Sequence, residues 1–238
     1  MVREKSLIVF GGSAKSLSLI SELNPDEVFW QDEVSSKKKY VDTLNNIEHI
    51  SNDIICVNWP FITPESELSH GNIYTIHESL LPSFSGCAPI NWSIIEGSPL
   101  FGITLFRQSS EIDAGDILFR DGFYMRNANA LAVFHRMEKC YKKCARFIRS
   151  NKLEDCKKLT NFGNRSYYSK RNHLQNVIQE GFEPDQLVNL FFSTTPDYPL
   201  VYKSSQEKYK IYSIKVFDEV LDYLPLGKPP SNTIEINF

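Results

Sequence analysis

Several features that would assign a function class directly are missing from this 238-residue sequence. No apolar run approaches the roughly 20 residues of a membrane-spanning helix, so a membrane is not expected as a partner. The net charge of −3 likewise does not favour nucleic acid as a partner. The opening stretch MVREKSLIVFGG holds only a short apolar run and reads as a β-strand rather than a signal peptide. We therefore expect a cytoplasmic protein.

Cysteines are few, and their spacing does not indicate a disulfide framework or a zinc site. The five cysteines are odd in number and include no CxxC pair. Cys140 and Cys144 lie one helical turn apart, but no His/Cys pair completes a zinc ligand set. The pattern favours reduced thiols and predicts no bound metal.

Strand and helix patterns alternate along the first half of the chain. A composition of 42 % hydrophobic and 23 % charged residues is that of a protein with a buried core. Apolar strands alternating with helices predict an α/β domain with a Rossmann-like, mostly parallel sheet. The predicted strands are 6–12, 26–30, 52–57, 72–76, 101–108 and 117–125, and the predicted helices are 13–23, 35–46, 88–97 and 129–150.

The long helix at 129–150 closes the first predicted domain, residues 1–150. Residues 151–238 differ in character and are predicted to form a small α+β extension. That extension contains a helix at 184–195 and, within 197–217, two strands joined by a polar turn, which is typical of a β-hairpin. We expect it to pack on the first domain or to take part in a homodimer interface.

Three loops that could carry chemistry follow predicted strands. In an open parallel sheet, ligands bind at the carboxyl ends of the strands. The loops are 11–16, 77–86 and 109–116. In the first, Gly11, Gly12 and Ser13 open a helix whose backbone N–H groups could hold a phosphate. The segment is not GxGxxG, so a plain tight turn is the alternative.

The other two loops contain a histidine and carboxylates. His77 ends an apolar strand, and the following Leu80 and Pro82 indicate a rigid loop anchored in the core. Asp113 lies in the turn EIDAGD with Glu111. A histidine and a carboxylate on neighbouring strand ends are the minimum for general acid–base catalysis. A buried structural histidine and a turn-capping aspartate remain the alternatives.

Two long stretches, IHESLLPSFSGCAPINWSIIEG and FGITLFRQSSEIDAGDIL, resemble the formyltransferases that use 10-formyltetrahydrofolate. That family includes the glycinamide ribonucleotide, methionyl-tRNA and nucleotide-sugar N-formyltransferases. The His-x-Ser-Leu-Leu-Pro element is residues 77–82, Ala88-Pro89 matches its continuation, and residues 112–116 match the acidic loop. The resemblance is close over residues 73–118 and implies the formyltransferase fold.

The resemblance implies catalytic roles for three residues. In the family, an amine attacks the formyl carbon, an Asn and a His bind the developing oxyanion, and an Asp supports the His. His77 and Asp113 match two of these, and Thr75 stands where the family has Asn. A threonine hydroxyl can donate one hydrogen bond. Either Thr75 serves with altered geometry, or turnover is slow, or the activity has been lost and a folate-binding protein remains.

The resemblance also implies where the substrates bind. 10-Formyltetrahydrofolate is expected as co-substrate in a crevice formed by Trp59, Leu80, Pro82, Glu111 and Asp113, although core packing equally explains Trp59. Serines at 83 and 85 stand where relatives have basic residues, which leaves acceptor phosphate contacts to the first loop. The residues assigned to the acceptor are Gly11, Gly12, Ser13 and Lys15.

The extension looks like that of the nucleotide-sugar N-formyltransferases. This favours a UDP- or dTDP-linked amino sugar as acceptor, in a reaction that supplies bacterial surface polysaccharide such as lipopolysaccharide O antigen. A methionyl-tRNA formyltransferase is the alternative enzyme, and it would need a basic face on the extension.

Overall fold

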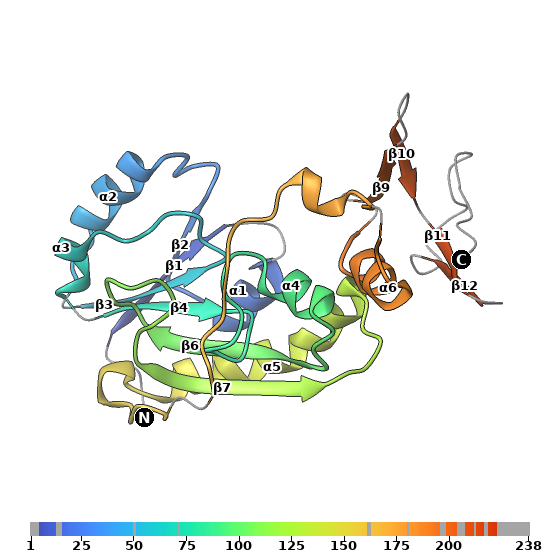
Figure 1. The fold of residues 1–238 in the computed structure, drawn as a ribbon. Helices are drawn as coiled ribbons and strands as arrows, with labels where there is room; N and C mark the ends of the chain where they lie inside the picture. The colour runs from blue at the N-terminus through green and yellow to red at the C-terminus, as the bar shows by residue number, and fades with distance from the viewer. Residues whose placement is uncertain are drawn as a thin grey trace. The chain divides into compact units, whose positions relative to one another are not determined.

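The architecture of the chain comes from a computed structural model (Figure 1). All structural statements concern the residues that this structure describes. These are 5–12, 16–49, 51–70, 72–160, 163–179, 181–195, 199–203, 208–211, 213–216 and 219–222.

A six-stranded mixed sheet forms the centre of the fold, with strand order β2-β1-β3-β4-β6-β7. Strands β1 to β4 pair in parallel, and β6 pairs antiparallel with β4. The predicted Rossmann-like, mostly parallel sheet is therefore confirmed. The strands are β1 (Ser6–Gly11), β2 (Glu27–Trp30), β3 (Asn52–Val57), β4 (Ile73–His77), β6 (Leu100–Arg107) and β7 (Ile117–Tyr124).

Helices flank this sheet, as the alternating sequence pattern predicts. The long α5 lies behind β6 and β7 in Figure 1, and its buried side chains, such as Met137 and Tyr141, recur every three to four residues. The Ser36 hydroxyl caps α2 by accepting a hydrogen bond from the Lys39 backbone N–H at 3.2 Å. The helices are α1 (Leu17–Leu23), α2 (Lys37–Asn45), α3 (Glu65–Leu68), α4 (Pro89–Ile95) and α5 (Ala130–Ser150).

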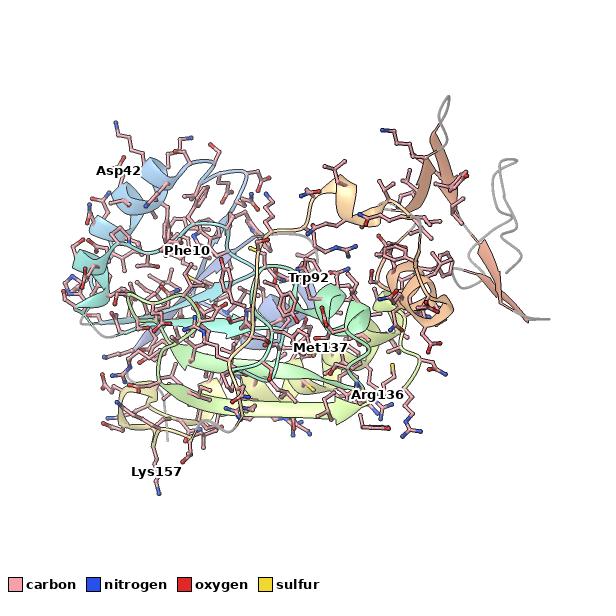
Figure 2. All side chains as sticks on the ribbon, in the orientation of Figure 1. Phe10, Asp42, Trp92, Arg136, Met137 and Lys157 are labelled. Atoms are coloured by element: carbon pink, nitrogen blue, oxygen red, sulfur yellow. The ribbon has the colours of Figure 1, made fainter. Side chains whose placement is uncertain are left out.

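Alternate side chains of the parallel strands pack under α2. Ile8 and Phe10 of β1 and Cys56 of β3 form a buried cluster with Tyr40 and Leu44 of α2. Phe10, labelled in Figure 2, contacts Tyr40 edge to face, with 5.0 Å between ring centroids. This packing fixes the face of the sheet from which the candidate site residues of β4 project.

The C-terminal part contains the predicted helix and hairpin. Helix α6 (Pro184–Phe192) packs its apolar residues with Leu200 of β9 and Ile211 of β10. Strands β9 (Leu200–Lys203) and β10 (Lys208–Ile211) are antiparallel, which confirms the hairpin. Shorter pieces are β5 (Ser85–Gly86), η2 (Leu153–Asp155), β8 (Tyr167–Tyr168), η3 (His173–Asn176), β11 (Ser213–Val216) and β12 (Glu219–Asp222).

The chain divides into two compact units, and each is made of several segments. The first unit contains residues 1–86, 102–123 and 136–167, and the second contains the remainder. The division into a catalytic domain at 1–150 and an extension at 151–238 stays a prediction. Over the described ranges, each helix is too short or too polar to span a bilayer.

Candidate active site

Strand β4 presents Thr75 and His77 on the same face, because side chains alternate along a strand. The intervening Ile76 is buried on the other face. Thr75 is only partly buried, and His77 is the last residue of the strand. Both side chains therefore stand at the carboxyl edge of the parallel part of the sheet, where ligands bind in such folds.

The imidazole of His77 lies between a backbone carbonyl and the carboxylate of Asp113. Its Nε2 is 2.8 Å from the carbonyl oxygen of Phe84, and since a carbonyl only accepts, Nε2 carries a proton. Its Nδ1 is 3.7 Å from Asp113 Oδ2. That separation exceeds a direct hydrogen bond, as is common for catalytic pairs before substrate binds. Nδ1 is thus the atom placed to exchange a proton with Asp113.

Asp113 is held by the backbone around it. The Gly86 N–H donates to Asp113 Oδ2 at 2.6 Å. Asp113 itself has φ of +50°, a left-handed conformation that aspartate tolerates better than most residues. Just beyond it, a Cβ on Gly115 would lie 1.6 Å from the Arg107 carbonyl oxygen, so only glycine fits there. The carboxylate is consequently fixed relative to the end of β6.

The Ser-Leu-Leu-Pro turn after His77 is braced by side-chain hydrogen bonds. The Thr104 hydroxyl donates to the Ser79 carbonyl at 2.7 Å and accepts from the Leu81 N–H at 3.1 Å. The Ser79 hydroxyl donates to the Ser83 carbonyl at 2.7 Å. Leu81 is buried against Phe106. These contacts give physical reasons for the rigid loop that the sequence indicates.

Gln108, which the sequence analysis did not single out, contacts Thr75. Its Nε2 donates to Thr75 Oγ1 at 2.7 Å. Thr75 is paired with Phe106 across β4 and β6, so Gln108 is its diagonal neighbour on the same face. Because Oγ1 accepts this hydrogen bond, the Thr75 proton is left for donation to another group. The sequence contains Gln108 at the end of a predicted strand, but its contact with Thr75 can be recognised only once the antiparallel register of β4 and β6 is known.

Residues 165–166, which follow α5, form hydrogen bonds with two loops of the site. The sequence analysis did not single out these residues. The Ser166 hydroxyl accepts from the Phe84 N–H at 2.8 Å, and its carbonyl accepts from the Ser85 N–H at 2.9 Å. Arg165 forms an ion pair with Glu111 and donates to the Ile112 carbonyl. Residues 165–166 thereby connect the 82–86 loop to the acidic loop. Their contacts span long sequence separations, which no local pattern reveals.

A cavity of about 270 Å³ opens beside Asp113. Its lining includes Leu81, Pro82, Asp113, Gly115 and Arg165. Small-molecule sites usually measure about 300–1,000 Å³, so this cavity fits part of a large ligand. Of the predicted folate contacts, Pro82 and Asp113 meet at this cavity.

The other predicted folate contacts lie elsewhere in the first unit. Glu111 is engaged by Arg165. The Leu80 side chain approaches Gly102, where a Cβ would lie 2.5 Å from Leu80 Cδ2. Trp59 packs in the aromatic cluster, with its ring centroid 5.1 Å from that of Phe10. Packing therefore accounts for Trp59, and its contact with folate stays a prediction.

The glycines at the end of β1 have a structural reason of their own. A Cβ on Gly12 would lie 1.6 Å from the Asn58 carbonyl oxygen, and the Gly12 N–H donates to the Val57 carbonyl at 2.9 Å. A Cβ on Gly11 would lie 2.7 Å from a side-chain atom of Ile20. The Gly12 N–H is thus already used within the sheet. Ser13 and Lys15 lie outside the described residues.

Two buried groups near the site stay protonated at neutral pH. Cys56 is paired with Thr75 across β3 and β4, and burial raises the pKa of its thiol to about 11. Burial, followed by the charge of Glu78, raises the pKa of Tyr141, whose hydroxyl donates to Glu78. A thiol with so high a pKa is not a nucleophile at neutral pH, so Cys56 has a packing role.

Comparison with known proteins assigns a family to the segment that contains this arrangement. Residues 15–131 match the family described as formyl transferase. The chain carries a formyl transferase domain. The matched segment contains Thr75, His77, Gln108 and Asp113, so the site described above lies within that domain.

Curated proteins with different names are similar to parts of this chain. One is the bifunctional polymyxin resistance protein ArnA of Wigglesworthia glossinidia brevipalpis, 26 % identical over 170 residues, 64 % of this chain. Another is the methionyl-tRNA formyltransferase of Clostridium perfringens, 38 % identical over 88 residues, 35 % of this chain. The matches span only 25 % and 28 % of those proteins' own lengths.

Solved structures share the fold of this chain at low sequence identity. A sugar N-formyltransferase from a Shewanella species superposes with a TM-score of 0.69 at 15 % identity, covering 87 % of this chain and 96 % of that one. HypX from Aquifex aeolicus in complex with tetrahydrofolic acid gives a TM-score of 0.66 at 17 % identity, covering 86 % of this chain and 37 % of that one. These likenesses establish the fold of the formyl transferase domain and its surroundings.

Proposed function

We propose that this chain transfers a formyl group from 10-formyltetrahydrofolate to the amino group of a UDP- or dTDP-linked amino sugar. The observation that carries the proposal is the approach of His77 Nδ1 to Asp113, with the Thr75 hydroxyl on the same strand face. An acid–base pair and a hydrogen-bond donor at a strand edge are what amine formylation requires.

Each proposed catalytic residue has a task in that reaction. The acceptor amine forms a bond to the formyl carbon, whose oxygen becomes an oxyanion. Thr75 donates a hydrogen bond to that oxyanion, and His77 Nε2 donates a second one in place of its hydrogen bond to the Phe84 carbonyl. Asp113, fixed by the Gly86 N–H, stabilises the proton on His77 and takes the proton that the amine loses. The bond from carbon to the folate N10 then breaks, and that proton returns to N10.

The formyl transferase domain and the cavity beside Asp113 support folate as the formyl donor. HypX, which shares the fold, is described as a complex with tetrahydrofolic acid. In this chain the cavity reaches Asp113 and is bordered by Pro82 and Arg165. We place the reacting end of the folate there, next to the proton-transferring pair.

The charge of the chain favours a sugar acceptor over tRNA. The net charge of −3 is unfavourable for binding tRNA. The fold does not separate the two acceptors, because a solved sugar N-formyltransferase and a solved methionyl-tRNA formyltransferase superpose on this chain with TM-scores of 0.69 and 0.68. Methionyl-tRNA formylation is nevertheless the second candidate, because a methionyl-tRNA formyltransferase is 38 % identical to this chain over 88 residues. In the sugar reaction the formylated product would supply surface polysaccharide. The enzyme would act in the cytoplasm as a homodimer.

An acceptor panel tests the assignment. The chain is incubated with 10-formyltetrahydrofolate and UDP- or dTDP-linked amino sugars in parallel with methionyl-tRNA, and formylated product is measured by mass spectrometry. We expect product with an amino sugar nucleotide and none with the tRNA. Product from the tRNA alone would move the assignment to the second candidate. No product from any acceptor, with activity gained in Thr75→Asn, would indicate an impaired formyltransferase.

A further inference from the structure

A second group of polar side chains lies at the opposite edge of the sheet from His77. His49 precedes β3, Glu67 is in α3, and His70 follows α3. Because β3 and β4 are parallel, the segments before them meet at the amino edge of the sheet. One ligand atom from each of the three side chains lies within 4.8 Å of the others. The sequence analysis, which looked for cysteine spacing, missed this cluster.

Asn72 fixes the protonation of His49 at one ring nitrogen. The Asn72 amide nitrogen donates to the His49 carbonyl at 2.6 Å and to the Asn52 carbonyl. Its oxygen therefore faces His49 Nδ1, 3.2 Å away. Since an amide oxygen only accepts, Nδ1 carries the proton. A histidine held in this way by an outer partner is the usual arrangement of a metal ligand.

The other ring nitrogen faces a carboxylate in a buried setting. His49 Nε2 is 3.4 Å from Glu67 Oε2, and the two side chains are only 8 % and 9 % exposed. Nε2 is buried and makes no hydrogen bond within the described residues. With the proton on Nδ1, a lone pair of Nε2 points toward a negative oxygen. Two acceptors in this position require a cation between them, which is either a proton or a metal ion.

His70 favours the metal ion. Its ring is stacked on that of His49, with 4.1 Å between centroids, and its side chain is exposed. One of its ring nitrogens lies within 4.8 Å of a ligand atom of His49 and of Glu67. A proton shared between His49 and Glu67 needs no third ligand, whereas a zinc-type ion takes three protein ligands and a water. The Glu67 carboxylate is itself oriented, because Oε1 accepts from the Ser66 hydroxyl at 3.2 Å.

We propose that His49 Nε2, Glu67 Oε2 and a nitrogen of His70 bind one Zn²⁺ or a similar divalent transition-metal ion. Two imidazoles and one carboxylate suit such ions and do not suit Mg²⁺ or Ca²⁺, which take oxygen ligands. The ion ties α3 to the loop before β3. The ion is separate from the His77 site, since the cluster and His77 stand at opposite ends of the parallel strands.

Direct metal binding tests the proposal. The full chain, produced without a polyhistidine tag and dialysed against a chelator, is titrated with Zn²⁺ in competition with a chromogenic chelator, and with Co²⁺ by visible absorption. We expect one metal per chain and the absorption bands of tetrahedral Co²⁺ with a nitrogen–oxygen ligand set. Mg²⁺ should not compete.

Variants separate the metal from a shared proton. His70→Ala removes an exposed side chain, so the fold should be retained, as circular dichroism would check. It should lower Zn²⁺ affinity by at least the roughly 10- to 100-fold that loss of an outer partner causes. His135→Ala, an exposed histidine of α5, is the matched control and should bind like the wild type. Zn²⁺ should also raise the melting temperature of the wild type and of His135→Ala only.

Two results would overturn the proposal. One is Zn²⁺ affinity in His70→Ala equal to that of the wild type, which would leave His49 and Glu67 as an ion pair. The other is the absence of tetrahedral Co²⁺ bands in the wild type. The exposed Cys87 is present in every variant, so binding there would not produce a difference between them.

Discussion

The amide nitrogen of Gln108 lies 2.7 Å from the hydroxyl oxygen of Thr75. Related formyltransferases, by the resemblance noted above, have an asparagine amide at the position of Thr75. In this chain an amide is present at the same edge but comes from the end of β6, one residue beyond Arg107. The Thr75 hydroxyl accepts a hydrogen bond from that amide and can donate one to another group. We propose that the pair provides the polar group that a lone threonine would supply only weakly.

Replacement of the threonine hydroxyl should therefore impair turnover. Thr75→Val keeps the shape of the side chain and removes the donor. We expect kcat to fall by about 10²–10³-fold, the usual effect of losing one oxyanion donor, with little change in KM. Thr43→Val, which removes a hydroxyl on the outer surface of α2, is the control and should leave steady-state kinetics unaltered. An unchanged kcat in Thr75→Val would exclude the hydroxyl from the mechanism.

The effect of Gln108 should depend on Thr75. If Gln108 acts through the Thr75 hydroxyl, Gln108→Ala lowers kcat in the wild type but has almost no further effect in Thr75→Val. The measurement is a double-mutant cycle on kcat/KM. Additive losses would instead mean that Gln108 contacts the substrate or stabilises the site on its own. The melting temperatures of the three variants show whether any loss is due to unfolding.

Arg165 should affect folate binding through the acidic loop. It borders the cavity beside Asp113 and pairs with Glu111. Arg165→Ala should raise KM for 10-formyltetrahydrofolate more than it lowers kcat, because the loop loses its attachment. Lys143→Ala, which breaks the ion pair of Lys143 with Asp121, is the matched control. A KM equal to that of the control would argue against this role.

Alkaline pH should destabilise the fold. Burial raises the pKa of Cys56 from 9.0 to about 11 and that of Tyr74 from 10.0 to about 12. Above about pH 9 the unfolded chain therefore binds fewer protons than the folded one, and the free energy of unfolding falls as pH rises. Melting temperatures between about pH 8 and pH 10.5 should decrease, less steeply in Cys56→Ala. A constant melting temperature over this range would contradict the prediction.

Local sequence patterns were sufficient for the main elements. The buried run at 52–57 and the apolar spacing of the long helix gave β3 and α5 within a few residues. The polar α3, only four residues long, was missed because it lacks an apolar period over which a helix could be recognised. Strand β12 follows the region in which the hairpin was sought.

The site was predictable only where its residues share one motif or one strand. His77 and Asp113 follow separate strands, and the rule for parallel sheets brought their loops together correctly. Gln108 and Arg165 could not be found in this way, since their contacts depend on strand register and on a segment 54 residues from Glu111. For Gly12, the sequence suggested phosphate binding, but the structure gives a packing reason for the glycine. Its backbone lies so close to the Asn58 carbonyl that a Cβ would not fit.

The most direct measurement is the rate of formyl transfer in His77→Ala, with His135→Ala as the control histidine. Turnover of 10-formyltetrahydrofolate with the preferred amino sugar nucleotide is followed by the formation of tetrahydrofolate. The account predicts loss of nearly all activity in His77→Ala and none in His135→Ala, with both variants folded. Activity in His77→Ala equal to that of the control would contradict it.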